Sequence, residues 1–359
     1  MIGYLYEVNP SYELLEKILS DYYNDIKYSV NVNIIIDFKQ IIRKIFREPN
    51  NFEDEELDSG LVVEEISSSI LNIIGHYRNF FYKQNKYTTF YILYSKSKCK
   101  SFERFNPQFK KDYYDKYTNI DNRKCRFVNK ITSIVEIICK YIPHCMFIDT
   151  SDYDENSYVN QLIEKNPKNE LNLLISDDFC LYQHLNENSV ALNMKGINTK
   201  VITAENAVSD FIKDPKINFS NKLIPLLLSL SGYEKYSISG INNVKYKKAA
   251  KFIKGLIFDS YLEDVYYVDF PLEDKHLEKF NLSENKLQEI KNNFYILNID
   301  QITSISSAKI ISKFIEIPKL ISISEINRIN NRFFSSYGLN LDMIWKGEKI
   351  LWEEQTGML

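Results

Sequence analysis

Cysteine, histidine, glycine and proline are all scarce in this sequence. Its 359 residues include five cysteines, four histidines, ten glycines and nine prolines. The odd number of cysteines and the lack of any Cys-x-x-Cys pair argue against both a disulfide framework and a zinc site, so we expect buried, reduced thiols. The histidines are scattered, without metal-ligand spacing. A hydrophobic share of 44% excludes a disordered or fibrous chain.

The sequence also lacks an excess of charge and a long apolar run. Lysine and arginine number 45 against 48 acids, which excludes coating of nucleic acid by bulk charge but permits a local basic patch. No segment reaches the roughly 18 apolar residues of a membrane span, and the first residues do not resemble a signal peptide. We expect a soluble protein that is not secreted. Its abundant Ile, Lys, Asn and Tyr suggest a viral or low-GC bacterial protein in the cytoplasm of the host cell.

Apolar runs alternate with amphipathic segments through the first 200 residues. This alternation predicts an α/β domain with a parallel sheet. The predicted strands are 33–37, 88–94, 146–148 and 171–175, followed by a hairpin at 189–203, and the predicted helices are 11–28, 38–46, 62–82, 122–142, 154–165 and one from about 178. From 204 onward the pattern is helical. We therefore predict domains at 1–203 and 204–345, with a tail at 346–359.

Carboxylates follow three of the predicted strands. Asp37 ends the first strand, Asp149 and Asp152 follow the third, and Asp177 and Asp178 follow the fourth. Ligands of open parallel sheets gather at the carboxyl ends of strands, so these acids are candidate Mg²⁺ ligands. Aspartates in such positions also commonly cap the next helix. From the residues alone, both interpretations stay open.

Several motifs resemble the phage 5′-nuclease (flap endonuclease) superfamily, which has a PIN-like fold. Within it, the resemblance is greatest to the T-even phage type of ribonuclease H. It covers most of the chain, in matching order and spacing. The matching segments are Ile36-Asp37-Phe38, Lys110-Lys111, Asp149 to Leu162, Leu173 to Asp178 with Gln183, Ser231 to Val244 continuing to Ala250, and Asn293 to Asp300.

The resemblance implies a PIN-like parallel sheet flanked by helices, and a helical C-terminal region containing a helix–hairpin–helix-type module. The family gathers about six or more acids around two Mg²⁺ ions, which activate water. Here several of those acids are replaced, by Tyr94 or Ser95, Asn156, Ser157, Cys180, Tyr233 and Tyr236. The acids that remain are Asp37, Asp154 and Asp178, with Asp177, Asp152 and Glu155 as substitutes after a small register shift. We expect no cofactor or one weakly bound Mg²⁺, and no secure catalytic set.

Two basic segments are candidate nucleic-acid-binding sites. Residues 96–130 contain eleven lysines and arginines against four acids, among them Lys110, Lys111 and Lys116, interleaved with aromatic residues. Basic residues follow phosphates and aromatic rings stack on bases. The second segment contains Gly240, Asn243, Lys245, Lys247, Lys248, Lys251 and Lys254. The resemblance places it where the family grips the duplex backbone, with Asn243 replacing a turn glycine.

Three functions remain open from the sequence. The first is a non-catalytic nucleic-acid-binding protein in viral replication, recombination or transcription, binding flapped, branched or single-stranded DNA or an RNA–DNA hybrid. The second is an active Mg²⁺-dependent 5′-nuclease or ribonuclease H with a rearranged acid set. The third is a structural subunit that binds protein. The tail at 346–359 contains Trp352 and is a candidate docking peptide for a sliding clamp or polymerase. No membrane partner is expected.

Overall fold

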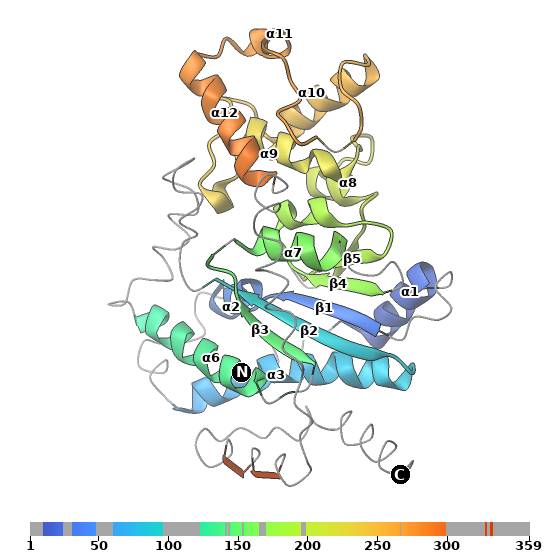
Figure 1. Cartoon of the computed structure of the whole chain (residues 1–359), viewed down its shortest axis with the longest axis vertical. Coiled ribbons are helices and arrows are strands. Elements are labelled where there is room, and N and C mark those ends of the chain that lie inside the picture. The colour runs from blue at the N-terminus through green and yellow to red at the C-terminus, as the bar shows by residue number, and fades with distance from the viewer. Residues whose placement is uncertain are drawn as a thin grey trace.

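A central β-sheet with helices on both faces organises the computed structural model (Figure 1). The structure describes residues 10–23, 31–47, 60–95, 123–140, 142, 144–152, 154–164, 170–194, 199–265 and 267–298, with two short pieces at 327–328 and 331–332. The candidate residues Lys110, Lys111 and Lys116 and the tail at 346–359 lie outside these ranges.

The sheet has six strands in the order β3-β2-β1-β4-β5-β6. The strands are β1 (Asn31–Asp37), β2 (Tyr87–Tyr94), β3 (Cys145–Asp149), β4 (Leu171–Ile175), β5 (Ser189–Asn193) and β6 (Lys200–Ile202). All neighbours are parallel except β5 and β6, which form the predicted antiparallel pair. Ile36 lies opposite both Ile92 and Ile175, so the carboxyl ends of the three central strands are level.

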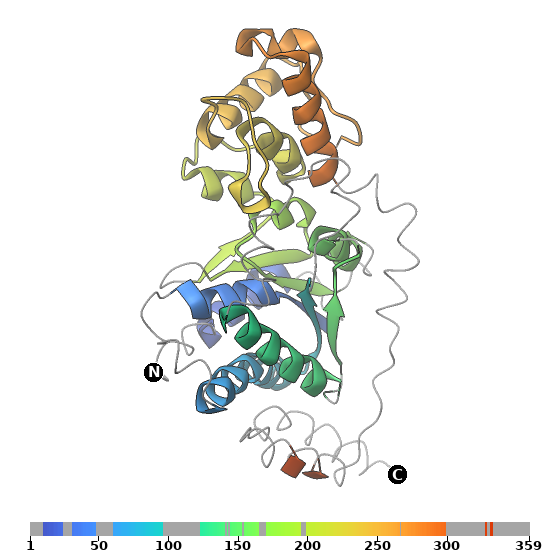
Figure 2. The ribbon, with the colours of Figure 1, turned by 90° about the vertical axis from the view of Figure 1, so that its left-hand side faces the viewer.

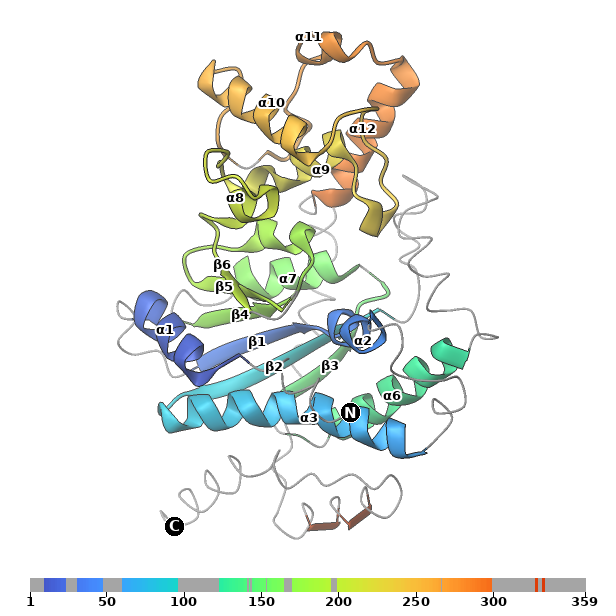
Figure 3. The same ribbon diagram turned by 180° about the vertical axis from the view of Figure 1, so that it is seen from behind.

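One face of the sheet is covered by the helices of the N-terminal half. These are α1 (Tyr12–Tyr23), α2 (Phe38–Arg47), α3 (Gly60–Lys83) and α6 (Arg123–Cys139). Figure 3 shows α3 and α6 running beneath the sheet. Their apolar side chains, such as Leu15, Tyr77 and Val135, form one buried cluster with Ile34 and Ile36 of β1. The short apolar runs of the strands are thus buried on this face of the sheet, as expected for parallel strands covered by helices.

The opposite face is covered by α7 (Asp154–Glu164) and the 3-10 helix η3 (Phe179–His184). A helical region extends beyond them (Figure 2). It contains α8 (Ala207–Ile212), η4 (Asn221–Leu223), α9 (Ile224–Ser231), η5 (Glu234–Tyr236), α10 (Tyr246–Phe258), α11 (Asp274–Leu277), η6 (Glu278–Phe280) and α12 (Glu284–Leu297).

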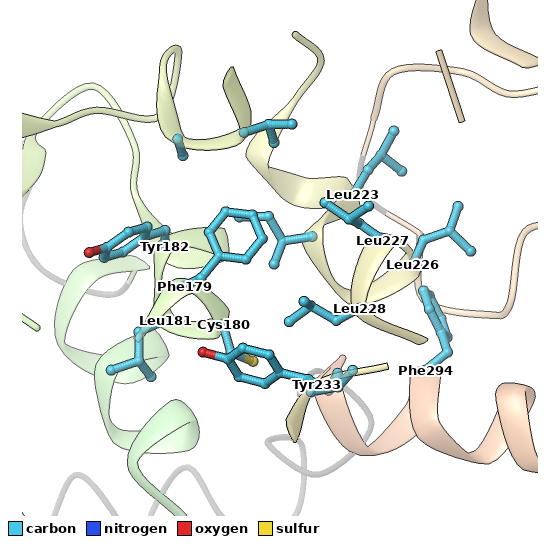
Figure 4. Close-up of a cluster of buried hydrophobic side chains, with 14 of the residues drawn as sticks. Phe179, Cys180, Leu181, Tyr182, Leu223, Leu226, Leu227, Leu228, Tyr233 and Phe294 are labelled. Carbon is cyan, nitrogen blue, oxygen red and sulfur yellow. The ribbon is translucent and has the colours of Figure 1, made fainter. Parts of the chain in front are cut away.

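A second apolar cluster joins the sheet to this helical region. It contains Ile35 and Leu174 of the strands together with Leu227 of α9 and Phe294 of α12. Figure 4 shows the contact between η3 and α9, with Phe179 facing the leucines. The proposed boundary at 203/204 therefore crosses a continuous core, and the division into domains stays a prediction.

The predicted α/β fold is confirmed, with one local difference. The helix predicted from about 178 is a 3-10 helix of six residues rather than an α-helix. It ends early because the backbone N–H of Leu185 bonds to the carbonyl of Tyr182, three residues back. Within the described ranges, no helix combines the length and the apolar character that crossing a membrane requires. Cys139, Cys145 and Cys180 are buried free thiols.

Candidate functional site

The carboxyl ends of β1 and β4 bring two of the predicted site segments into contact. Asp37 ends β1, and Ser176 follows β4 on the neighbouring strand. The Ser176 hydroxyl donates to Asp37 Oδ2 over 3.0 Å, and both side chains are buried. The parallel register therefore delivers Asp37 and the 176–178 loop to the same place, as the sequence predicts.

Asp178 is the best-connected carboxylate of this cluster. It caps η3, because its Oδ1 accepts from the backbone N–H of Cys180 at 3.1 Å. Its own backbone N–H donates to the Ser176 hydroxyl at 3.0 Å. The helix-cap interpretation of the strand-end acids is thus correct for Asp178. A capping carboxylate is held in one orientation, which fixes the direction of its second oxygen.

The side chains that reach Asp178 from the helical region are two tyrosines and a lysine. The Tyr233 hydroxyl donates to Oδ1 at 2.9 Å, and the Tyr236 hydroxyl donates to Oδ2 at 2.8 Å. Lys235 Nζ lies 3.0 Å from the same Oδ2 and 3.2 Å from Oδ1 of Asp177. Figure 4 shows Tyr233 reaching across to Cys180 in η3. Both oxygens of Asp178 are therefore engaged by groups of the chain itself.

The protonation of the two phenols suits this arrangement. Burial, and after it the negative charge of Asp178, raises the pKa of Tyr233 and of Tyr236 well above the ordinary tyrosine range. Both hydroxyls therefore keep their protons at neutral pH and act as hydrogen-bond donors. The positive charge beside Asp177 and Asp178 is supplied by Lys235, whose side chain is 17% exposed.

A second lysine is paired with an acid on the neighbouring helix. Lys39, two residues after Asp37, forms an ion pair with Glu155 of α7, and both side chains are buried. Asp154 begins α7 and is fully buried. It has φ 69°, in the left-handed region that aspartate tolerates better than most residues. The charges of Asp154 and Glu155 also contribute to the raised pKa of Tyr236, which places them near its phenol.

Two neutral residues that the resemblance places where the family has acids, Asn156 and Cys180, contact each other. Asn156 donates from Nδ2 to Cys180 Sγ at 3.3 Å, inside the core. Gln183 donates to the Cys180 carbonyl at 2.8 Å and to the Leu297 carbonyl of α12 at 3.1 Å. Amide, thiol and phenol groups thus occupy the space between α7, η3 and η5.

This arrangement does not fit a pair of divalent ions. Mg²⁺ needs a near-octahedral shell of oxygen atoms, usually one or two carboxylates with several waters. Asp178 already accepts two phenol hydrogen bonds, and the ammonium of Lys235 would repel a second cation. Among the described residues, no group of three or more His, Cys, Asp or Glu side chains is arranged to hold a metal. Asp37, Asp154 and Asp178 are each buried here, and one weakly bound ion stays a prediction.

Sequence reasoning missed Lys39, Lys235 and Ser176. A signal for Lys235 existed, because it lies between Tyr233 and Tyr236, which the resemblance places where the family has two acids. A positive charge inserted between two lost negative charges is the pattern expected when a lysine takes over the role of a counter-ion. Ser176 lies in the segment from Leu173 to Asp178 that resembles the family, although we assigned it no role, whereas Lys39 carried no signal.

The N-terminal half of α10 presents the second candidate surface. Lys245, Lys247, Lys248, Lys251 and Lys254 are all exposed. Lys245 is the N-cap residue, its side chain makes no capping bond, and the first turn contains no acid. Cations at the positive end of a helix dipole are unfavourable unless an anion binds there. Lys247 is already paired with Asp214 at 2.8 Å, and this hydrogen bond lowers the pKa of Asp214.

The loop before α10 departs from the expected use of glycine. Asn243 has φ 61°, the left-handed conformation that its place in the resembled turn requires. Gly240 serves a different purpose, because a Cβ there would lie 2.2 Å from the backbone nitrogen of Gly232. Its role is to let two backbone segments approach closely. The helix–hairpin–helix assignment for this region stays a prediction.

Comparison with solved structures identifies the fold. The zinc-bound 5′-exonuclease of bacteriophage T5 superposes with a TM-score of 0.54 and 15% identity, over 80% of this chain and 100% of that one. The bacteriophage T5 flap endonuclease, in a product complex with DNA and metal ions, gives 0.53 and 14%, over 80% and 97%. No family model and no curated protein sequence matches. A specific likeness to T-even ribonuclease H stays a prediction. The chain has the fold of the 5′-nuclease, or flap endonuclease, superfamily.

Proposed function

We propose that this chain is a non-catalytic nucleic-acid-binding protein built on a 5′-nuclease fold. The observation that carries the proposal is the closure of Asp178 by Tyr233, Lys235 and Tyr236. Two-metal hydrolysis needs carboxylates that are open to the ions and to the attacking water. Here the corresponding carboxylate is occupied by hydrogen-bond donors and a cation from the chain.

Charge balance supports the same conclusion. A nuclease site holds an excess of negative charge, which divalent ions neutralise when they bind. In this chain Lys235 is paired with Asp177 and Asp178, and Lys39 is paired with Glu155. A divalent ion would have to displace the ammonium groups of buried Lys39 and half-buried Lys235, which would then lack a partner in a poorly solvated place. The proposed role therefore uses the fold and its surface, without hydrolysis.

The nucleic-acid part of the proposal is supported by α10. Its exposed lysines have the charge and spacing to contact successive phosphates, and its uncapped first turn suits an anion. The T5 flap endonuclease with the same fold was crystallised with DNA. We expect flapped, branched or single-stranded DNA as the ligand, with Lys110, Lys111 and Lys116 as a second contact. Viral replication, recombination or transcription is the proposed setting.

Binding as a function of salt tests the proposal. Each neutralised phosphate contributes about −0.9 to the slope of log K against log salt on duplex DNA. Changing Lys247, Lys248 and Lys251 together to Ala should weaken binding and flatten the slope by about one to three. The matched control changes Lys17, Lys83 and Lys140, which are exposed on α1, on α3 and just after α6. It should leave both quantities nearly unchanged.

One further variant sharpens the assay. Asp214→Asn removes the partner of Lys247 and should raise the affinity for DNA, because the lysine becomes available to a phosphate. Absence of salt-sensitive binding to any DNA or RNA would refute the proposal that the chain binds nucleic acid. Mg²⁺-dependent cleavage of a 5′-flap or an RNA–DNA hybrid, abolished by Asp37→Ala, would instead establish an active nuclease.

A further inference from the structure

Exposed apolar side chains concentrate in one segment of the helical region. Phe258 at the end of α10 is 87% exposed, and Tyr261, Val265 and Val268 in the following loop are 61%, 45% and 51% exposed. The other large apolar side chains exposed in the described part of the chain are Tyr12, Tyr87 and Ile137, on separate elements. Single exposed apolar residues are ordinary, but a local group marks an interaction surface.

The segment is held in place by its own contacts. Leu262 is buried, and the backbone N–H of Tyr261 donates to the Leu256 carbonyl at 2.8 Å, which folds the chain back on α10. Asp264 Oδ1 accepts from the backbone N–H of Ser220 at 2.7 Å. At the far end, Asn298 Nδ2 donates to the Val268 carbonyl at 3.2 Å. Because the backbone is already fixed, a partner binding here pays little entropy for ordering it.

The charge of this segment is opposite to that of the helix before it. Between Lys254 and Lys275 there is no lysine, arginine or histidine, and there are six acids. The acids closest in sequence to the exposed apolar residues are Asp259, Glu263 and Asp264, all exposed. Phosphates would be repelled here, so nucleic acid bound to the lysines of α10 does not account for the exposed Phe258. An apolar centre with an acidic rim complements a segment with apolar and basic side chains.

We propose that Phe258, Tyr261, Val265 and Val268, with the acidic rim of Asp259, Glu263 and Asp264, form a docking surface for a partner protein. The segment that binds is an amphipathic one, with aliphatic or aromatic residues on one side and lysine or arginine beside them. Phe258 is the main anchor of the docking surface. As a large, exposed aromatic side chain, it has the most water-accessible apolar area to bury when a partner binds. Phe258 lies four residues after Lys254 on α10, so this acidic–apolar surface adjoins the lysines proposed to bind DNA but differs from them in charge.

Fluorescence anisotropy with labelled model peptides tests this surface on the full-length protein. The main probe is a short Leu/Lys peptide with leucines at helical spacing. Two matched probes separate the contributions: a Ser/Lys peptide with the same charge, and a Leu/Glu peptide with the same apolar face. The test variant is Phe258→Ser with Val265→Ser. The control variant is Ile137→Ser, which removes an exposed apolar residue from α6.

We expect the Leu/Lys peptide to bind the wild type more tightly than either matched probe. The double variant should lose about tenfold or more of this affinity, whereas Ile137→Ser should not change it. Binding of single-stranded DNA should be the same in the wild type and the double variant. Equal binding of the Leu/Lys and Ser/Lys peptides, or no effect of the double variant, would overturn the proposal. Loss of DNA binding in the double variant would assign the surface to nucleic acid, and a concentration-dependent dimer abolished by it would assign the surface to a second copy.

Discussion

Removing the ammonium of Lys235 should destabilise the protein far more than removing an ordinary surface lysine. The Lys235 side chain is 17% exposed, and those of its partners Asp177 and Asp178 are 8% and 5% exposed. Taking one partner from a buried ion pair costs about 3–5 kcal/mol. Two phenol hydrogen bonds to Asp178 remain, so we expect the lower end, about 3 kcal/mol, for Lys235→Met. At about 2–4 °C per kcal/mol, the melting temperature should fall by about 6–12 °C.

Urea unfolding and thermal melting measure this effect, with Lys222→Met as the matched control. Lys222 pairs with Glu164 at 2.9 Å, but the two side chains are 26% and 38% exposed. An exposed pair contributes about 1 kcal/mol or less, so the control should change little. If Lys235→Met destabilises the protein no more than Lys222→Met does, the ammonium does not neutralise the buried carboxylates and our reasoning is wrong.

The same variant tests whether Lys235 takes the place of a bound cation. Without the ammonium, Asp177 and Asp178 become a pair of acids able to attract a divalent ion. A ligand present at ten times its Kd stabilises the folded state by about 1.4 kcal/mol. Millimolar Mn²⁺ should therefore recover part of the lost stability in Lys235→Met and leave the wild type unchanged. Equal stabilisation of both proteins would refute this role for the lysine.

Three further changes probe other parts of the structure. Gly240→Ala should destabilise the protein by about 3 kcal/mol or more, because the added Cβ would overlap the backbone of Gly232. At Gly255 an added Cβ meets nothing within 4 Å, so Gly255→Ala should stabilise α10 by about 0.5–1 kcal/mol. Urea unfolding midpoints measure both effects. Tyr233→Phe should cost about 1.5–3 kcal/mol by removing a hydroxyl that donates to a buried carboxylate, and an unchanged midpoint would contradict this. Burial lowers the pKa of His184 well below its ordinary value, and the nearby charge of Lys222 lowers it further. The neutral imidazole therefore contributes its full stabilisation above about pH 6.5, and this stabilisation is lost as the pH falls further. His184→Gln should flatten the acid side of the stability profile, and an identical profile would count against this assignment.

The fold was predictable because its signals are local. The strands β1 and β4 are short, largely apolar runs. β1 ends at Asp37, and β4 is followed at once by Ser176. Such runs, alternating with helical segments, predict buried parallel strands. The placement of Asp37 follows directly, because the last residue of a strand lies at the edge of the sheet. The contact between Asp37 and Ser176 then follows from the pairing of β1 with β4.

The closure of the site was not predictable, because it depends on side chains far apart in the sequence. Tyr236 is 58 residues from Asp178, and nothing in the spacing shows that both meet at one carboxylate. The Lys39–Glu155 pair likewise joins two residues that lie far apart in the sequence, one on α2 and one on α7. The sequence indicated that acids were missing. Only the packing of the helical region against η3 indicates which groups have taken their place.

The apolar cluster that runs from the sheet into α9 and α12 makes the two halves of the chain mutually dependent for folding. Ile35 and Leu174 belong to strands, yet part of their cover comes from residues beyond 204. A fragment ending at 203 would keep α7 and η3 on that face of the sheet, but it would expose the apolar side of η3 that packs against α9 and lose the hydrophobic free energy of that burial. The helical region would likewise lose the surface on which α9 rests. The position of the α10 lysines thus depends on a buried cluster that extends into the sheet. We therefore expect a destabilising core substitution in β4 to weaken the proposed binding of nucleic acid as well.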